Sequence, residues 1–288
     1  MPYIYLVLAI ITGLVHNLAG TVYNRKIEGY KAAVPIYNLM MILSITIGWA
    51  VLFCIDGEFS LAVLPYSIAF GVCFAMTAFG LINAYKHGST ALTGLILQLS
   101  IIAATIWGFF FWGAPVTFLS IIGIILVVIS MVLCLYEKGA KNKKITPKWV
   151  FYTAMVFVCN AVCTILQKTE QLEFNGKYGP QFMFMATLIS SVVHIVIYIR
   201  SDKSDNLKII KKAWGYPVAS GVCNVFMNLF IIILATSTLS PTVIYPTTGV
   251  AGIALITVFS ALFLKEKIAP NQYAGIAVGA AAVLILSL

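Results

Sequence analysis

Several polar side chains interrupt long apolar stretches of this sequence, where each would be costly to bury without a partner. His16 and Asn17 are adjacent in the first stretch, and Asn224 and Asn228 are four residues apart, on one face of a helix. An imidazole titrates near neutral pH, and a carboxamide both donates and accepts hydrogen bonds. Such groups can replace the water around a polar but uncharged ligand.

These residue types define a candidate substrate-binding set, to which aromatic residues with a hydroxyl group are added. The predicted set is His16, Asn17, Tyr37, Asn160, Asn224, Asn228 and Tyr245. The competing interpretation of each is structural, as a hydrogen bond between helices or as a packed ring. For His194, also deep in an apolar stretch, we favour the structural interpretation.

Acidic side chains are missing from the middle of the apolar stretches, since all nine fall in loops or at the ends of stretches. A carboxylate inside a span is the usual cation or proton site in a membrane, so proton coupling would require histidine. Anionic cargo would need cations, and only Lys86 and Lys168, at the ends of stretches, are candidates.

Sequence patterns for catalysis and metal binding are also missing. The chain has no Walker motif and no HExxH. Its six cysteines include no CxxC, and the pair Cys159 and Cys163 is best read as apolar packing. We therefore predict no enzyme, no metal and no cofactor.

The composition indicates that lipid is the solvent of this chain. Of its residues 61% are hydrophobic and only 9% are charged, against about 25% charged in soluble domains. The net charge of +9 arises from basic residues in short gaps between apolar stretches, a pattern typical of membrane topology and not of nucleic-acid binding.

Ten stretches are long enough to cross about 30 Å of hydrocarbon. The predicted spans are 3–22, 36–54, 66–85, 90–112, 117–136, 149–168, 181–199, 213–235, 241–263 and 270–287. Sixteen basic residues follow odd-numbered spans, against Lys168 and Lys177 on the other side. This bias predicts a plasma (bacterial inner) membrane protein with both termini outside. Near span ends, Trp49, Trp112, Trp149 and Trp214 are predicted interfacial anchors.

The two halves of the chain, 1–140 and 141–288, resemble each other. Four features recur in the same order at similar offsets: Asn17 and Asn160, Pro35 and Pro180, Gly71 and Gly221, Gly123 and Gly275. Two successive repeats of five spans must enter the membrane from opposite sides. We therefore predict an all-α integral membrane protein of ten helices in two inverted five-helix repeats, with a site at their interface.

The C-terminal segment resembles a known family of transporters. Tyr245-Pro246-Thr247-Thr248-Gly249 opens a helix rich in small residues, which ends at Phe263-Leu264-Lys265-Glu266-Lys267, and Tyr273-Ala274-Gly275 opens the last helix. This pattern is similar to the end of the drug/metabolite transporter superfamily, in its EamA-like ten-helix branch. The chain departs from it in having Lys265 where the family usually has glycine. It also lacks the first-span glutamate of the four-helix cation exporters.

The resemblance and the repeat together predict a secondary transporter that works by alternating access. The expected cargo is a small neutral or zwitterionic metabolite such as an amino acid, with export implied by the family alone. One alternative is a nucleotide-sugar or phosphorylated-metabolite exchanger, and others are a membrane-embedded lipid-handling enzyme or a scaffold. The expected partners are the cargo and the lipid bilayer. We expect a monomer or a homodimer, because the GxxxG from Gly275 to Gly279 permits either internal packing or dimerisation.

Overall fold

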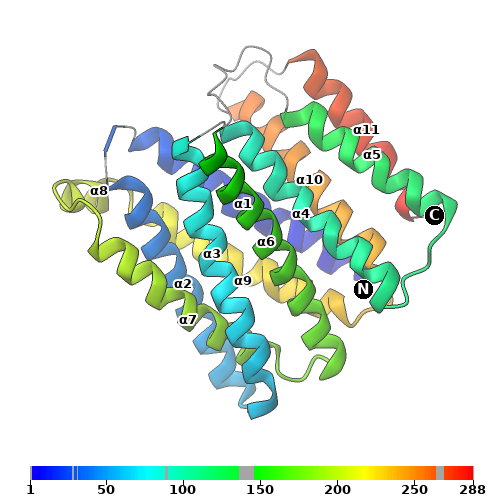
Figure 1. Ribbon diagram of the computed structural model, residues 1–288, viewed down its shortest axis with the longest axis horizontal. Helices are drawn as coiled ribbons and strands as arrows, with labels where there is room; N and C mark the ends of the chain where they lie inside the picture. The colour runs from blue at the N-terminus through cyan, green and yellow to red at the C-terminus, as the bar shows by residue number, and fades with distance from the viewer. Residues whose placement is uncertain are drawn as a thin grey trace. The chain divides into compact units, whose positions relative to one another are not determined.

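The computed structural model describes residues 2–27, 29–30, 32–87, 90–135, 146–263 and 269–287, and their regular structure is entirely helical. Figure 1 shows the helices, which are α1 (Pro2–Lys26), α2 (Ala33–Asp56), the 3₁₀ turn η1 (Leu61–Val63), α3 (Leu64–His87), α4 (Thr90–Phe111), α5 (Phe118–Leu135), α6 (Pro147–Glu173), α7 (Gly179–Ile199), α8 (Asn206–Ala213), α9 (Gly215–Ala235), α10 (Pro241–Phe263) and α11 (Pro270–Ser287).

Seven of these helices are long and apolar enough to cross a membrane within the described residues: α1, α2, η1 with α3, α6, α7, α9 and α10. Shorter apolar helices cover Ile96–Phe111, Phe118–Cys134 and Pro270–Leu286. An α-helix rises 1.5 Å per residue, so about 20 residues cross the hydrocarbon. The prediction of an all-helical, multi-pass membrane protein is confirmed.

Two predicted spans stop four and five residues short of their helices, and the predicted start of a third falls in a separate short helix. The first extends to Lys26 rather than ending at residue 22, and the sixth extends to Glu173 rather than to 168. The eighth was predicted to begin at 213, but a separate short helix, α8, precedes α9. These ends were misplaced because polar residues near a span end lower its hydropathy without breaking the helix. The predicted turn at 265–267 and the basic residues within 136–145 lie outside the described residues, as does the side chain of Lys86.

Contacts between helices divide the chain into two compact units. Unit 1 comprises Met1–Ala75 and Leu166–Ser237, and unit 2 comprises Met76–Ile165 and Thr238–Leu288. Each unit therefore takes helices from both halves of the sequence, and α3 and α6 contribute to both units. The predicted division at residue 140 concerns the sequence repeat and stays a prediction.

In unit 1, α9 packs along α1 and α2, and α2 packs along α7, as Figure 1 shows for the last pair. Two glycines permit very close approach. A Cβ built on Gly221 would lie 2.7 Å from the carbonyl oxygen of Met41, and one on Gly71 would lie 2.5 Å from that of Ala186. Both distances are to backbone atoms. At these points α9 therefore packs on α2, and α3 packs on α7, without an intervening side chain.

In unit 2, α5 and α11 run side by side (Figure 1), and α10 packs against α4, α5 and α11. A Cβ built on Gly279 would lie 2.5 Å from a methyl carbon of Val250 and 2.6 Å from the hydroxyl oxygen of Ser130. A Cβ built on Gly275 would lie 2.9 Å from the backbone nitrogen of Cys134. The GxxxG pattern is therefore used for packing inside unit 2.

Two tryptophans do not lie where interfacial anchoring would put them. Trp49 and Trp149 are buried, and the indole nitrogen of Trp149 donates to Thr93 Oγ1 at 2.9 Å. The anchoring prediction is wrong for both, because proximity to a span end says nothing about which side of the helix faces its neighbours. Trp214 is exposed, as predicted.

Candidate functional site

A polar stripe runs along α9 in unit 1. Ser220, Asn224 and Asn228 are spaced by four residues and therefore share one face of the helix. Over eight residues the stripe extends for about 12 Å. Its side chains contact polar groups on α1, on α2 and near the end of α6.

At one end of the stripe, Ser220 joins two side chains of the predicted set. Tyr37 donates from its hydroxyl to Ser220 Oγ at 2.8 Å, and His16 Nδ1 lies 2.8 Å from Ser220 Oγ and 3.0 Å from its carbonyl oxygen. A carbonyl oxygen can only accept, so the imidazole donates from Nδ1, and the hydroxyl of Ser220 donates to the backbone carbonyl oxygen of His16 at 3.2 Å. No hydrogen bond to Nε2 of the imidazole is found within the described residues.

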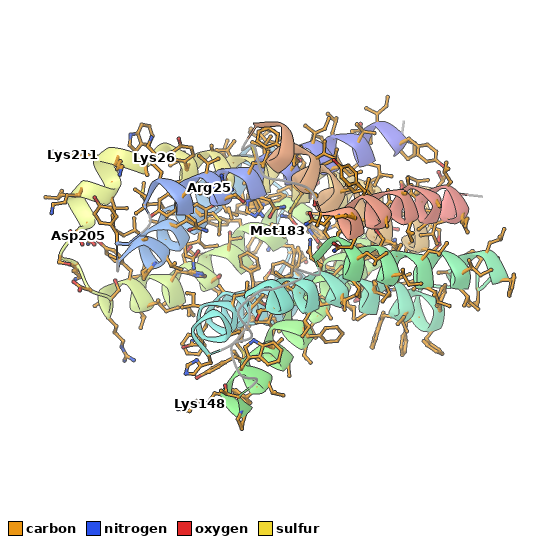
Figure 2. The ribbon with its side chains drawn as sticks, turned by 90° about the horizontal axis from the view of Figure 1, so that it is seen from above. Arg25, Lys26, Lys148, Met183, Asp205 and Lys211 are labelled. Atoms are coloured by element: carbon orange, nitrogen blue, oxygen red, sulfur yellow. The ribbon has the colours of Figure 1, made fainter. Side chains whose placement is uncertain are left out.

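At the other end of the stripe, carboxamides bond to each other. Asn228 Nδ2 donates to Asn224 Oδ1 at 3.0 Å, and Gln167 Nε2 donates to Asn228 Oδ1 at 3.1 Å. Gln167 Nε2 also lies 4.0 Å from the sulfur of Met183 on α7, labelled in Figure 2. Carboxamides are neutral at every physiological pH, so this chain of amides can form hydrogen bonds without contributing a charge.

Two ionisable residues are buried within one turn after Gln167 on α6, one and three positions further along. Lys168 is 4% exposed and donates to the carbonyl oxygen of Ala235 at 2.9 Å. Glu170 is fully buried, and one of its oxygens accepts a hydrogen bond from Gln171. Its other oxygen has no hydrogen-bond partner among the described residues. A buried carboxyl group with an unpaired oxygen is costly, which marks this end of α6 as a functional candidate.

The loops at this end of unit 1 are tied together by polar contacts. The backbone nitrogen and carbonyl of Ser60 bond reciprocally to the carboxamide of Gln181, each at 2.8 Å. Lys177 pairs with Glu58 at 3.3 Å, and this carboxylate raises the pKa of Lys177 above its usual value. The contacts fix the connection between α2 and α3 against the start of α7.

Unit 2 contains a second group of polar side chains. Asn160 Nδ2 donates to Ser100 Oγ at 2.7 Å, which links α6 to α4. On α10, Tyr245 is buried with its ring 6.2 Å from that of Trp112. Pro246 lies inside this helix and has no backbone N–H, so it deprives the Thr242 carbonyl of its usual helical partner.

The predicted residues are thus only partly brought together. Within unit 1, His16 and Tyr37 meet through Ser220, and Asn224 bonds to Asn228. Asn17 is exposed and bonds to the carbonyl of Gly13 in its own helix, at 3.0 Å. His194 bonds to the Ser190 carbonyl one turn back at 2.8 Å, which fits the structural interpretation.

Sequence reasoning did not single out Ser220, Gln167 or Glu170, and it named Lys168 only as a candidate cation for anionic cargo. A signal was available for Ser220, which precedes Asn224 by four residues. Lys168 was predicted to end its span, although α6 continues for five residues beyond it. Burial of that last part of α6 could not be read from hydropathy.

The fold and these sites are those of an all-helical, multi-pass membrane protein. Residues 147–288 match the EamA-like transporter family, so this segment of the chain is an EamA domain, and the resemblance noted in the sequence is confirmed. A solved crystal structure matches over 99% of this chain and 95% of its own, with a TM-score of 0.75 and 14% identity. That identity shows a common fold alone. No curated protein matches the sequence.

Proposed function

We propose that the protein is a secondary transporter of a small neutral or zwitterionic metabolite, such as an amino acid. The observation that carries the proposal is the polar stripe Ser220–Asn224–Asn228 with its partners His16, Tyr37 and Gln167, all inside candidate membrane spans. Hydrogen-bonding groups in a span are costly unless they serve binding or helix association. The EamA domain at 147–288 supports transport over the structural interpretation.

The proposal includes two inverted five-helix repeats, and contacts in unit 2 support this arrangement. Gly123 and Gly275 are equivalent at an offset of 152 residues, and so are Cys134 and Leu286. A Cβ built on Gly123 would lie 2.6 Å from the side chain of Leu286, and one built on Gly275 would lie 2.7 Å from the sulfur of Cys134. Exchanging the two halves of the sequence converts one contact into the other, as a two-fold axis requires.

Contacts in unit 1 support the same relation independently. Gly71 and Gly221 correspond at an offset of 150, and Met41 and Ala186 at 145, the offset of Pro35 and Pro180. Gly221 approaches the Met41 carbonyl, and Gly71 approaches that of Ala186. Helices from opposite halves therefore repeat one backbone contact, which favours alternating access by two related repeats.

In this mechanism the stripe supplies hydrogen bonds to the uncharged parts of the cargo. Asn224 and Asn228 exchange their mutual bond for bonds to cargo, and His16 Nε2 adds a titratable group. Asn17, Asn160 and Tyr245 remain proposed substrate-binding residues. The chain acts by binding and conformational change, without a cofactor or an enzymatic step.

The charges at the end of α6 favour a zwitterion over an anion. Lys168 alone could attract a phosphate, which would suit a nucleotide-sugar or phosphorylated-metabolite exchanger. However, Glu170, two residues further on, is also buried. The end of α6 therefore carries one basic and one acidic group instead of a cluster of cations, which disfavours an anionic cargo.

The proposed orientation places both termini outside the plasma or bacterial inner membrane. The ends of α1 and α7 carry Arg25, Lys26 and Arg200 and lie at one end of unit 1, beside α8. This agrees with a cytoplasmic location for the loops that follow odd-numbered spans. The export direction rests on family resemblance alone.

A two-stage experiment tests the proposal. Purified protein is first screened by thermal shift against amino acids, polyamines, nucleotides and sugars, because a bound ligand raises Tm by mass action. The compound that raises Tm is then used in proteoliposome counterflow with wild type, Asn224→Ala and Asn228→Ala. Loss of one or two hydrogen bonds, about 1–3 kcal/mol, predicts a fall in kcat/KM of roughly 5- to 150-fold.

The matched control is Asn83→Ala, because within the described residues the side chain of Asn83 bonds to the Phe79 carbonyl of its own helix and to no other helix. This variant should transport at the wild-type rate. Wild-type kcat/KM in both stripe variants would refute the site. A complete absence of thermal shift and counterflow for every class of compound would refute the transport function.

A further inference from the structure

A basic patch covers one end of unit 1, where α1 and α7 end and α9 begins. This surface, the α8 patch, consists of the exposed residues Arg25, Lys26, Arg200, Lys203, Lys208, Lys211 and Lys212. Among the described residues of these segments the acidic ones are Asp202 and Asp205, so seven positive charges less two negative ones leave five. Figure 2 shows Arg25, Lys26 and Lys211 at this end.

The helix at the centre of the patch has three distinct faces. Ile209 and Ala213 are buried and pack into a core with Tyr23 and Ile27 of the α1 end. Lys208, Lys211 and Lys212 follow at spacings of three and four residues and form a basic face.

The third face of α8 is apolar and open. It consists of Leu207, which is 74% exposed, with Ile210 and Trp214, which is 56% exposed. These residues are also spaced by three and four. A helix that exposes leucine and tryptophan beside lysines is typical of the membrane interface, where the apolar side chains enter the acyl region.

Tyrosine rings position several of the lysines. The ammonium of Lys26 lies 5.1 Å from the centre of the Tyr216 ring, and that of Lys212 lies 5.8 Å from the Tyr30 ring. Lys203 lies 5.8 Å from the ring of Tyr198. A cation over a ring face is attracted to it but remains open to an anion on its other side. The patch therefore presents ammonium groups from α1, α8 and the loop before α8.

We propose that the α8 patch binds the phosphate headgroups of anionic phospholipids, with Leu207 and Trp214 among the acyl chains. Charge complementarity favours an anion, and the apolar face favours a lipid over a soluble acidic protein. Furthermore, α9 is a candidate span that begins directly after Trp214. The patch must therefore lie at the depth of the headgroups. The inference is independent of the transported cargo.

The test compares two lipids by native mass spectrometry of the full chain released from mixed micelles. Dissociation constants are measured for phosphatidylglycerol and phosphatidylcholine. Each basic residue near an anionic lipid surface contributes a factor of about five. We expect wild type to bind phosphatidylglycerol at least about tenfold more tightly. The triple variant Lys208→Gln/Lys211→Gln/Lys212→Gln should bring the two constants close together.

Three controls separate the causes of binding. Lys148→Gln, at an exposed lysine of α6, should keep the wild-type preference. Trp214→Ser should weaken both lipids to a similar extent, because it removes insertion and leaves the charge. Millimolar inorganic phosphate should leave phosphatidylglycerol bound, whereas 1 M NaCl should abolish the preference by screening.

Three results would overturn the inference. The first is a wild-type protein that binds the two lipids equally, and the second is a triple variant that retains the preference while its Tm matches that of wild type. Displacement of the lipid by inorganic phosphate would likewise overturn it, since the patch would then be a site for a soluble anion.

Discussion

Replacing Gly221 with alanine tests how tightly α9 packs against α2 beside the polar stripe. The added Cβ would lie 2.6 Å from the Cβ of Ser44 and 2.7 Å from the carbonyl oxygen of Met41. A carbon–carbon contact is comfortable at about 3.5–4.0 Å, so the helices must separate by roughly 1 Å. The obstacle includes backbone, which cannot rotate out of the way.

The expected cost follows from overpacking a close contact. Such insertions destabilise a core by about 1–3 kcal/mol, and alanine offsets this by up to about 1 kcal/mol through its better helix propensity. A chain of this size changes Tm by about 2–4 °C for each kcal/mol. We therefore expect Gly221→Ala to lower Tm by several degrees in detergent.

Gly252→Ala is the matched control, because Gly252 is also helical and a Cβ there meets nothing within 4 Å. Its Tm should be unchanged or higher. Both variants are followed by thermal unfolding, with gel filtration to verify that each is monodisperse. Opposite signs for the two glycines would show that packing, and not helix propensity, sets the result.

The inverted-repeat proposal adds a second expectation to the same experiment. A Cβ built on Gly71 would lie 2.5 Å from the Ala186 carbonyl oxygen, and so Gly71→Ala should cost about as much as Gly221→Ala. A Gly221→Ala protein as stable as wild type would refute the close packing. A large loss at Gly221 together with none at Gly71 would refute the equivalence of the two contacts.

Three further predictions concern polar and reactive side chains. Tyr37→Phe and Ser220→Ala should each lower the free energy of unfolding by about 1 kcal/mol. The double variant should lose less than the sum of the two, because the two side chains share one hydrogen bond. Additive losses would contradict the bond. Glu170→Gln should leave Tm at pH 7 unchanged or raised, because it removes a buried charge; a clear fall would mean that the anion is stabilised. In native protein a maleimide should label exposed Cys54 and reach buried Cys163 only after denaturation, as followed by mass spectrometry of the peptides, and equally rapid labelling of the two cysteines would contradict this.

Helix positions were largely predictable, because hydropathy records the solvent that a segment meets. Spans predicted at 241–263 and 270–287 coincide with α10 and α11. The errors fall where a helix leaves the hydrocarbon, as at Glu173, the last residue of α6. There the backbone continues its hydrogen-bond ladder although its side chains have become polar.

The candidate site was predictable in its residue types and only partly in its contacts. Asn224 and Asn228 were paired correctly, since four residues along one helix fix a neighbour locally. The link from His16 to Tyr37 was not predictable, because it passes through Ser220 on a third helix. The burial of Trp49 was missed for the same reason, since neighbouring helices decide which face of a helix is covered.

The sequence by itself determined that this chain is a multi-pass membrane protein and which polar side chains lie within its helices. It also determined the ends of most helices to within a few residues. Those properties are local, because they depend on the hydropathy and backbone hydrogen bonds of continuous segments. Tertiary structure alone decided that Ser220 bridges two helices and that Lys168 and Glu170 are withdrawn from water. Such outcomes depend on the rotation of each helix against partners distant in sequence, which no local pattern encodes.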